Sequence, residues 1–493
     1  MKKQSFLYGA SILAVASILC KIMSAVFKIP LDRFFLHEEG IAVYQSAYSV
    51  YNVFLAICVT GIPIALSSLV AKSSEKEAAE LSKSTLFFVT ALMSFCAVLL
   101  IVFSLPLAQL MSGGKEGEAQ LSLIVLALSL PAMGIISSRR GYFQGMENMT
   151  PSAVSQLTES FVKVVLGIIV CAFTVKYGVS IGAAGAICGV SVGSLCSSLV
   201  LELFYRKSNP IKTKPSLKQA IKVVKISVPM TLGAFGFTAV MLTDSLTVTK
   251  ILALLGFDLE TRLGLFGYLT RANTVYNLPA TIITAFTASA VPSVAQAFAK
   301  GSKEGQSESA KNVLQLVFLI AVPCMLGMTL FSKEILTLLY GTGKSSNLLV
   351  LAGVMALIMP YIQTTTAMLQ TLGKVWLPIC ASIGAVVLKA LLNSLFIGKF
   401  GIEGAMISTI CAFSLVFVFN TVLLMRTVSL KGLFKPVFKI ILCALISVLG
   451  ARLLYSATGG TLMLLVSVTA AGTVYLAGVI FTRVLNKKEF FTK

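Results

Sequence analysis

Apolar segments of about 20 residues recur along the whole chain, separated by short polar stretches. A helix needs about 20 mostly apolar residues to cross a lipid bilayer, so each segment is a candidate transmembrane helix. Some segments are longer than one crossing requires, which means that those helices tilt or extend into water. The pattern predicts an all-α polytopic membrane protein with 14 transmembrane helices. The candidate segments are 6–27, 41–71, 84–111, 120–138, 151–176, 179–205, 223–250, 264–298, 312–332, 346–372, 375–398, 402–425, 434–456 and 461–482.

The composition supports this class and excludes others. Of the 493 residues, 57% are hydrophobic and only 12% are charged, whereas about one quarter of an average soluble domain is charged. The net charge of +21 does not indicate a nucleic-acid partner, because such a binder needs a solvated basic face that so apolar a chain cannot supply. The ten cysteines lie in apolar segments without a C-x-x-C pair, and His37 is the only histidine. We therefore expect neither a disulfide framework nor a metal site.

The distribution of basic residues predicts the orientation in the membrane. With both termini in the cytoplasm, 26 of the 40 Lys and Arg residues fall on the inside, 10 on the outside and 4 within the predicted helices. The largest inside block lies at 206–225. Cytoplasmic loops of membrane proteins carry an excess of Lys and Arg. The charges therefore predict a multi-pass protein of the cytoplasmic membrane with both termini inside.

The two halves of the chain resemble each other at a nearly constant offset. The sequence Val-Tyr-Asn at 50–52 recurs at 275–277, and Lys163 recurs as Lys389. This duplication predicts two pseudo-symmetric six-helix lobes in parallel orientation, followed by two further helices. Paired lobes are typical of alternating-access transporters, whose substrate site lies between the halves near the membrane midplane. The predicted parts are an N-terminal lobe at 1–205, a basic cytoplasmic linker at 206–222, a C-terminal lobe at 223–426 and two extra transmembrane helices at 427–493.

Ionisable and hydrogen-bonding residues inside three predicted helices indicate a site for an anion. An ionisable residue in the middle of a span costs about 2.5–3.5 kcal/mol on insertion scales, so each one needs a reason. Arg offers paired donors and Lys a point charge, which together suit a phosphate or a pyrophosphate. Two alternatives stay open: Lys28 could extend to the outer interface, and Tyr48 could belong to an interfacial aromatic belt. The candidate substrate-binding residues are Lys21, Lys28, Tyr48, Asn52, Arg271 and Asn277.

A second polar set lies in the predicted C-terminal lobe, around the acid Asp244. An acid near amides and hydroxyls could bind Na⁺ or a proton and couple its gradient to transport, or it could form a fixed salt bridge with Lys389. The candidate residues for this ion coupling or salt bridge are Asp244, Lys389, Asn393 and Thr409. In the other lobe Glu159 and Lys163 are four residues apart, which is a favourable spacing for an ion pair on one helix.

Two stretches of the sequence resemble a known group of proteins. The predicted loop after the fourth helix reads Arg-Arg-Gly-Tyr-Phe-Gln-Gly-Met at 139–146 and is followed by Thr-Pro-Ser-Ala-Val-Ser-Gln at 150–156. The eighth helix reads Tyr-Leu-Thr-Arg-Ala at 268–272, followed by Tyr-Asn-Leu-Pro at 276–279. Both resemble the stage V sporulation protein B group of Gram-positive bacteria. That group is similar to the lipid II flippases and belongs to the multidrug/oligosaccharidyl-lipid/polysaccharide exporter superfamily.

The resemblance implies a flippase in the bacterial cytoplasmic membrane, with a link to sporulation. Its cargo would be an undecaprenyl-pyrophosphate-linked cell-wall precursor such as lipid II, moved from the inner to the outer leaflet. We expect a monomer without catalytic residues or a cofactor, with this lipid-linked oligosaccharide and membrane lipids as its partners. In lipid II flippases essential cations lie on the first, second and eighth helices. Lys21 or Lys28 matches the first position loosely, Arg271 matches the eighth, and the second helix has no cation.

Lipid II flippases also have a cation site on their seventh, eleventh and twelfth helices. Asp244, Asn393 and Thr409 match positions of that kind, whereas Lys389 departs from it, so sodium dependence does not carry over and coupling to Na⁺ or H⁺ stays open. Three alternative functions also stay open. They are a flippase for a polysaccharide or teichoic lipid-linked oligosaccharide, a multidrug extruder of the same superfamily, and a membrane scaffold in envelope assembly. Cations inside the membrane favour an anionic cargo over a cationic drug.

Overall fold

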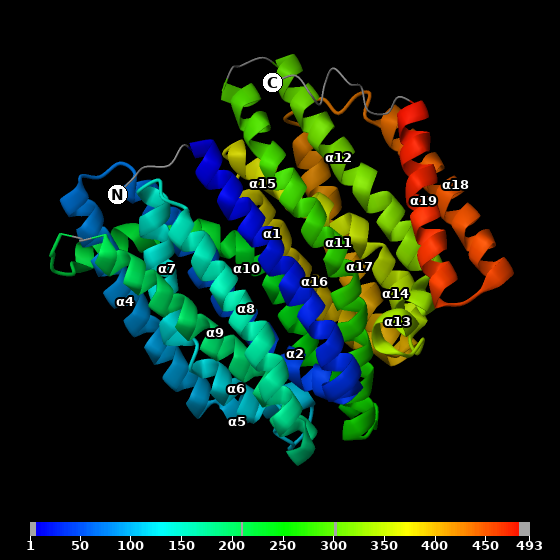
Figure 1. Ribbon diagram of the computed structural model, residues 1–493, viewed down its shortest axis with the longest axis horizontal. Helices are drawn as coiled ribbons and strands as arrows, with labels where there is room; N and C mark the ends of the chain where they lie inside the picture. The colour runs from blue at the N-terminus through cyan, green and yellow to red at the C-terminus, as the bar shows by residue number, and fades with distance from the viewer. Residues whose placement is uncertain (1–5, 209–210, 300–302, 483–493) are drawn as a thin grey trace. The chain divides into compact units, whose positions relative to one another are not determined.

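The computed structural model describes residues 6–208, 211–299 and 303–482, and every element in these ranges is a helix (Figure 1). The all-α prediction is therefore confirmed. The N-terminal elements are α1 (Phe6–Leu31), η1 (Asp32–Leu36), α2 (His37–Leu55), η2 (Ala56–Gly61), α3 (Ile62–Val70), α4 (Glu75–Val102), α5 (Ser104–Ser112), α6 (Gln120–Ala127), α7 (Leu130–Gly145), α8 (Thr150–Thr174), η3 (Val175–Tyr177) and α9 (Val179–Lys207). The remaining helices are α10 (Leu217–Leu254), α11 (Leu259–Ala299), α12 (Lys303–Leu330), α13 (Ser332–Tyr340), α14 (Ser346–Gly353), α15 (Met355–Thr371), α16 (Trp376–Phe400), α17 (Ile402–Met425), α18 (Phe434–Thr458) and α19 (Thr461–Phe481).

Eleven helical segments within the described ranges are long and apolar enough to cross a membrane, or twelve if the bent pair α6 and α7 is one span. One of them is the continuous run Ser11–Val70, in which the sequence predicts two spans. At 1.5 Å per residue, these 60 residues would form a straight helix of about 90 Å, three times the hydrocarbon thickness. The run is interrupted at His37, whose φ of 50° lies outside the helical region. The count of 14 stays a prediction.

The chain divides into two compact units, which are described separately. Unit 1 contains residues 1–270 and 382–405, and unit 2 contains residues 271–381 and 406–493. These divisions fall at other positions than the predicted lobe boundaries, which stay a prediction.

In unit 1, α8 packs against α9 and against α1, and Figure 1 shows α1 beside α8. The contact between α8 and α9 is backbone to backbone, because a Cβ added at Gly189 of α9 would collide with the backbone of Gly167 in α8. Ser17 of α1 donates to Gln156 of α8. Two turns further along, Lys163 of α8 donates to Ser24 of α1, and both pairs are 139 residues apart in the sequence. A constant separation means that α1 and α8 run in the same direction, as the first and fifth spans should.

The outer surface of unit 1 carries large apolar side chains. Phe95 of α4, Phe161 and Phe173 of α8 and Leu199 of α9 are each at least 60% exposed. Large apolar side chains exposed in this way are a liability in water and are expected where helices face lipid. Together with the apolar helices, it supports a multi-pass membrane protein.

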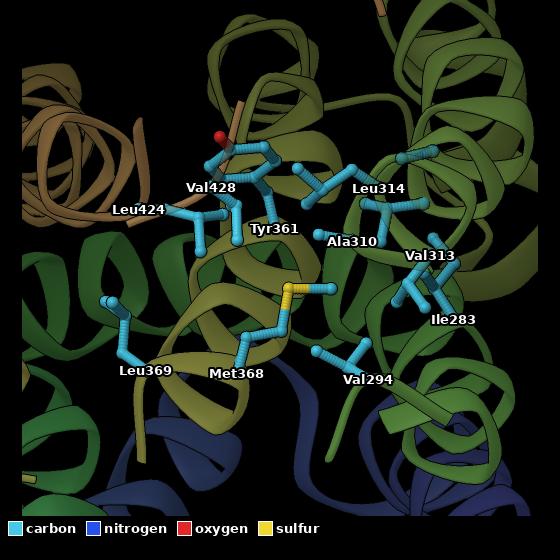
Figure 2. Close-up of a cluster of buried hydrophobic side chains, with 12 residues drawn as sticks. Ile283, Val294, Ala310, Val313, Leu314, Tyr361, Met368, Leu369, Leu424 and Val428 are labelled. Carbon is cyan, nitrogen blue, oxygen red and sulfur yellow. The ribbon is translucent and has the colours of Figure 1, made fainter. Parts of the chain in front are cut away.

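Unit 2 has its own apolar core (Figure 2). Buried residues of α12 and α15, among them Val313, Leu314 and Tyr361, pack with Leu424 of α17. The last two helices, α18 and α19, form a pair beside α12, where the hydroxyl of Tyr475 donates to a backbone carbonyl of α12 at 2.6 Å. The extra helices predicted at 427–493 are therefore packed onto unit 2 by their own side chains.

Candidate functional site

Lys28 lies in the last turn of α1 and points at α2. Its ammonium donates to Gln45 Oε1 at 2.9 Å and lies 5.1 Å from the centre of the Tyr48 ring. The Tyr48 ring stacks in turn on Tyr44 and Tyr51, each at 5.4 Å between ring centres. Helical spacing on α2 produces this ladder, because residues three or four apart share a face. The cation of Lys28 is thus held by an amide and an aromatic ring, both of them neutral.

Lys163 of α8 reaches the same tyrosine. Its ammonium donates to Ser24 Oγ of α1 at 2.6 Å and lies 5.8 Å from the centre of the Tyr48 ring. Only 7% of Lys163 is exposed. The ion pair suggested by the spacing of Glu159 and Lys163 does not form, because the carboxylate of Glu159 is bound elsewhere.

The carboxylate of Glu159 is held by α7 and α2. Arg140 donates to Glu159 Oε2 at 2.8 Å, and the hydroxyl of Tyr51 donates to Glu159 Oε1 at 3.1 Å. Arg140 also donates to Ser155 and Ser197, which satisfies several donors of its buried guanidinium. This network neutralises Arg140 and ties together four helices of unit 1.

The neighbouring Arg139 has a similar arrangement. It donates to Glu202 at 2.9 Å, and its guanidinium lies 3.4 Å from the centre of the Tyr205 ring. The stretch 139–146, predicted as a loop, is helical to Gly145 at the end of α7. The correction has a physical reason, since both arginines find acids on neighbouring helices and need no water. The buried guanidinium groups of the motif thus hold α7 against α8 and α9.

Asp244 of α10 and Lys389 of α16 form a fully buried ion pair within unit 1. Lys389 Nζ lies 2.7 Å from Asp244 Oδ2, and the two side chains are 0% and 3% exposed. Asn393, one turn after Lys389, donates to Asp244 Oδ1 at 3.2 Å and to Thr247 at 2.9 Å. The ammonium thus contacts one carboxylate oxygen of Asp244, and the amide of Asn393 contacts the other.

The other candidate residues have different surroundings. In unit 2, Arg271 of α11 is 4% exposed, and its guanidinium lies 5.2 Å from the centre of the Tyr340 ring. Asn277 donates to a backbone carbonyl one turn earlier in α11, and Thr409 of α17 is buried. In unit 1, Lys21 is exposed and Asn52 is half-buried. Lys21 and Lys28 therefore share a helix face but not an environment.

Within the described residues, no group of three or more His, Cys, Asp or Glu side chains could hold a metal ion. The ten cysteines are free thiols. Sequence reasoning had not found three features of unit 1: the role of Gln45 as an acceptor for Lys28, the position of Lys163 beside Tyr48, and the pairing of the motif arginines. Gln45 lies three residues before Tyr48, which places both on one face of a helix and could have indicated the first of these features.

Comparisons with known proteins show which bacterial proteins this chain is similar to. The chain is 26% identical over 510 residues to stage V sporulation protein B of Bacillus subtilis (strain 168), covering 99% of this chain and 98% of that protein. It is 22% identical over 435 residues to the lipid II flippase MurJ of the same organism, covering 82% and 79%. A solved structure of the lipid II flippase MurJ in an inward closed conformation, 15% identical, covers 97% of this chain and 98% of that chain, with a TM-score of 0.73.

Two family models also match. The model described as MatE matches residues 269–395. The model described as polysaccharide biosynthesis protein matches residues 6–298, which is more than half of the chain. This membrane protein, with homologues that are flippases and sporulation proteins, thus belongs to the polysaccharide biosynthesis protein family.

Proposed function

We propose that this protein is an alternating-access flippase of the bacterial cytoplasmic membrane. Its cargo is an undecaprenyl-pyrophosphate-linked cell-wall precursor of the lipid II type, which it moves from the inner to the outer leaflet. The proposal includes 14 transmembrane helices in two lobes, cytoplasmic termini, a monomer, and transport without catalysis. The full-length similarity to stage V sporulation protein B supports a role in sporulation.

The observation that carries this proposal is the un-neutralised cation of Lys28. A charge inside the membrane is costly, and membrane proteins normally pair it with an opposite charge. Lys28 is half-buried, yet its contacts are the neutral Gln45 and Tyr48. An anionic group on the cargo would supply the missing charge and remove part of that cost. A pyrophosphate, with several oxygens that accept charge-assisted hydrogen bonds, has suitable chemistry.

A buried cation in the other unit supports the same class of cargo. Arg271 lies over the Tyr340 ring, so its guanidinium is oriented by an aromatic face. Guanidinium groups bind phosphates through paired donors, which favours an anionic headgroup over a cationic drug. The multidrug extruder is therefore the weaker alternative. A flippase for another lipid-linked oligosaccharide, such as a polysaccharide or teichoic precursor, remains the second candidate because it carries the same anionic linkage.

The ion pair of Asp244 and Lys389 is relevant to whether a sodium gradient drives transport. We propose that the ammonium of Lys389 takes the place of a bound cation, so that transport does not depend on sodium. The 2.7 Å contact and the near-complete burial of both side chains support this proposal. The Asn393 amide completes the coordination of the carboxylate.

The test uses cells whose own lipid II flippase is depleted. Production of the wild-type protein should restore growth and the accessibility of lipid II at the outer face of the membrane. Lys28→Gln should lower the outward lipid II signal about tenfold, because it removes a charge-assisted hydrogen bond, whereas Lys28→Arg should retain most of it. A Lys28→Gln variant that works as well as wild type would show that the mechanism is wrong. Restoration of a different glycan in place of lipid II would establish the second candidate.

A further inference from the structure

We infer that Lys163, together with Lys28, forms a pyrophosphate subsite around Tyr48 in unit 1. The inference rests on the proposed function and adds a binding residue on α8. The ammonium groups of Lys28 and Lys163 lie 5.1 and 5.8 Å from the centre of the same ring, so they are at most about 11 Å apart. Two like charges this close repel each other in a medium of low dielectric constant. A structure that served stability alone would not keep both.

The acid that precedes Lys163 on α8 does not neutralise this pair. Glu159 lies one turn before Lys163 on α8, but its two oxygens accept from Arg140 and from Tyr51. In the described part of unit 1, Lys163 contacts the Ser24 hydroxyl and the Tyr48 ring, and Lys28 contacts Gln45 and the same ring. The described part of unit 1 thus uses one carboxylate for the arginine and leaves two lysines with neutral partners.

The remaining hydrogen-bonding capacity shows what these lysines can bind. An ammonium has three donors, and each lysine uses one of them in a hydrogen bond to a neutral side chain. The free donors of two neighbouring ammonium groups suit an anion that carries several oxygens on two linked centres. A pyrophosphate has this chemistry, whereas a single carboxylate or a monophosphate has fewer acceptors to share between two cations.

The position of Lys163 also compensates for a gap in the sequence. The second predicted helix, which contains Tyr48, has no cation. The parallel packing of α1 and α8 places the Lys163 ammonium against Ser24, one turn before Lys28 on α1, and close to the Tyr48 ring. A lysine of the fifth span therefore supplies, beside the second span, the positive charge that the second span lacks.

The experiment measures binding to the purified full-length protein in detergent. The probes are farnesyl pyrophosphate, inorganic pyrophosphate and farnesyl monophosphate. Wild type should bind farnesyl pyrophosphate best and the monophosphate worst. Lys163→Gln should weaken the binding of both pyrophosphates about tenfold, because one charge-assisted contact is lost, and Lys163→Arg should restore most of it. The matched control is Lys176→Gln, which removes an exposed lysine that lies over a tyrosine ring just after the end of α8.

A second variant keeps the test decisive if Lys163→Gln does not fold. Ser24→Asp places a carboxylate next to the Lys163 ammonium, so that it provides a tethered anion at the subsite. The variant should raise the melting temperature of the free protein and weaken pyrophosphate binding. A Ser24→Asp variant that folds and binds both pyrophosphates as tightly as wild type would overturn the inference.

The outcomes separate this inference from the proposed function. If wild type and Lys163→Gln bind farnesyl pyrophosphate equally well, the subsite is wrong and the flippase proposal stands. If wild type neither binds farnesyl pyrophosphate nor restores the outward lipid II signal in the depleted cells, the flippase proposal itself fails. Equal affinity of wild type for the monophosphate and the pyrophosphate would overturn the assignment of two linked phosphates.

Discussion

Unit 1 holds two lysine sites that differ in the charge of their partners. Lys389 contacts a carboxylate at 2.7 Å and is completely buried. Lys28 and Lys163 share one tyrosine ring, and in the described part of unit 1 they contact neutral side chains. The first site balances its own charge, and the second retains an excess of positive charge.

The difference shows how a membrane protein can separate stability from binding. A buried ion pair costs desolvation, and mutual attraction offsets most of that cost only while both partners are present. A cation without a counter-charge costs more in the free protein and gains most when an anionic ligand arrives. We therefore expect changes at Asp244 and Lys389 to act first on folding, and changes at the other two lysines to act first on binding.

The largest effect on stability should come from breaking the ion pair of Asp244 and Lys389. Asp244→Ala leaves the Lys389 ammonium buried without its carboxylate and should destabilise the protein by about 3–5 kcal/mol. The double variant Asp244→Ala/Lys389→Leu should recover most of this loss, because it removes both charges. Thermal unfolding of the purified protein in detergent measures both values. A double variant no more stable than the single one would show that the ion pair is not the source of the loss.

The same pair provides a test for sodium. Lys389→Asn replaces the ammonium with a neutral amide whose oxygen can coordinate a cation, so a sodium ion could then reach the carboxylate. We expect sodium to raise the melting temperature of this variant, with potassium as the control, and to leave that of wild type unchanged. A sodium-dependent stabilisation of wild type that disappears in Lys389→Asn would contradict the idea of a tethered cation.

The sequence predicted the membrane class and helical fold because runs of about 20 apolar residues carry that information locally. It also identified Asp244 and Lys389 as possible partners. It could not choose between a salt bridge and a bound ion, because the choice depends on a contact across 145 residues. The pairing of Glu159 was missed for a similar reason. The spacing on one helix favoured Lys163 as the partner of Glu159. In the structure the planar guanidinium of Arg140, on the neighbouring helix α7, contacts the carboxylate at 2.8 Å.

The break within the run Ser11–Val70 lies at His37, between the predicted spans 6–27 and 41–71. The end of α7 was harder to predict from hydrophobicity alone. The stretch 139–146 was expected to be a loop because two adjacent arginines are typical of cytoplasmic loops. The acids that bind them lie 19 residues away in one case and 63 in the other. A charge pattern read along the chain does not reveal such partners.

An intermediate effect on stability and binding should come from giving the site of Lys28 and Lys163 a negative charge. Arg140→Gln frees the carboxylate of Glu159, which can then turn towards Lys163 one helical turn away. We expect a loss of stability of about 2–3 kcal/mol, because a buried network is broken, and a several-fold loss of farnesyl pyrophosphate affinity. Arg140→Gln/Glu159→Gln should bind more tightly than the single variant, since no acid remains to neutralise Lys163. Equal binding by the two variants would contradict the role of charge imbalance.

The smallest effect should come from Lys21, which shares a face of α1 with Lys28. Lys21 is exposed, whereas Lys28 is half-buried and bound by Gln45. Lys21 lies seven residues before Lys28, about 10 Å along the axis of α1, and makes none of the contacts around Tyr48, so Lys21→Gln should change farnesyl pyrophosphate affinity less than about twofold. Lys28→Gln should weaken the same binding about tenfold. If the two variants weakened binding equally, spacing along the helix rather than burial beside Tyr48 would define the site, and the contrast with the balanced pair would lose its basis.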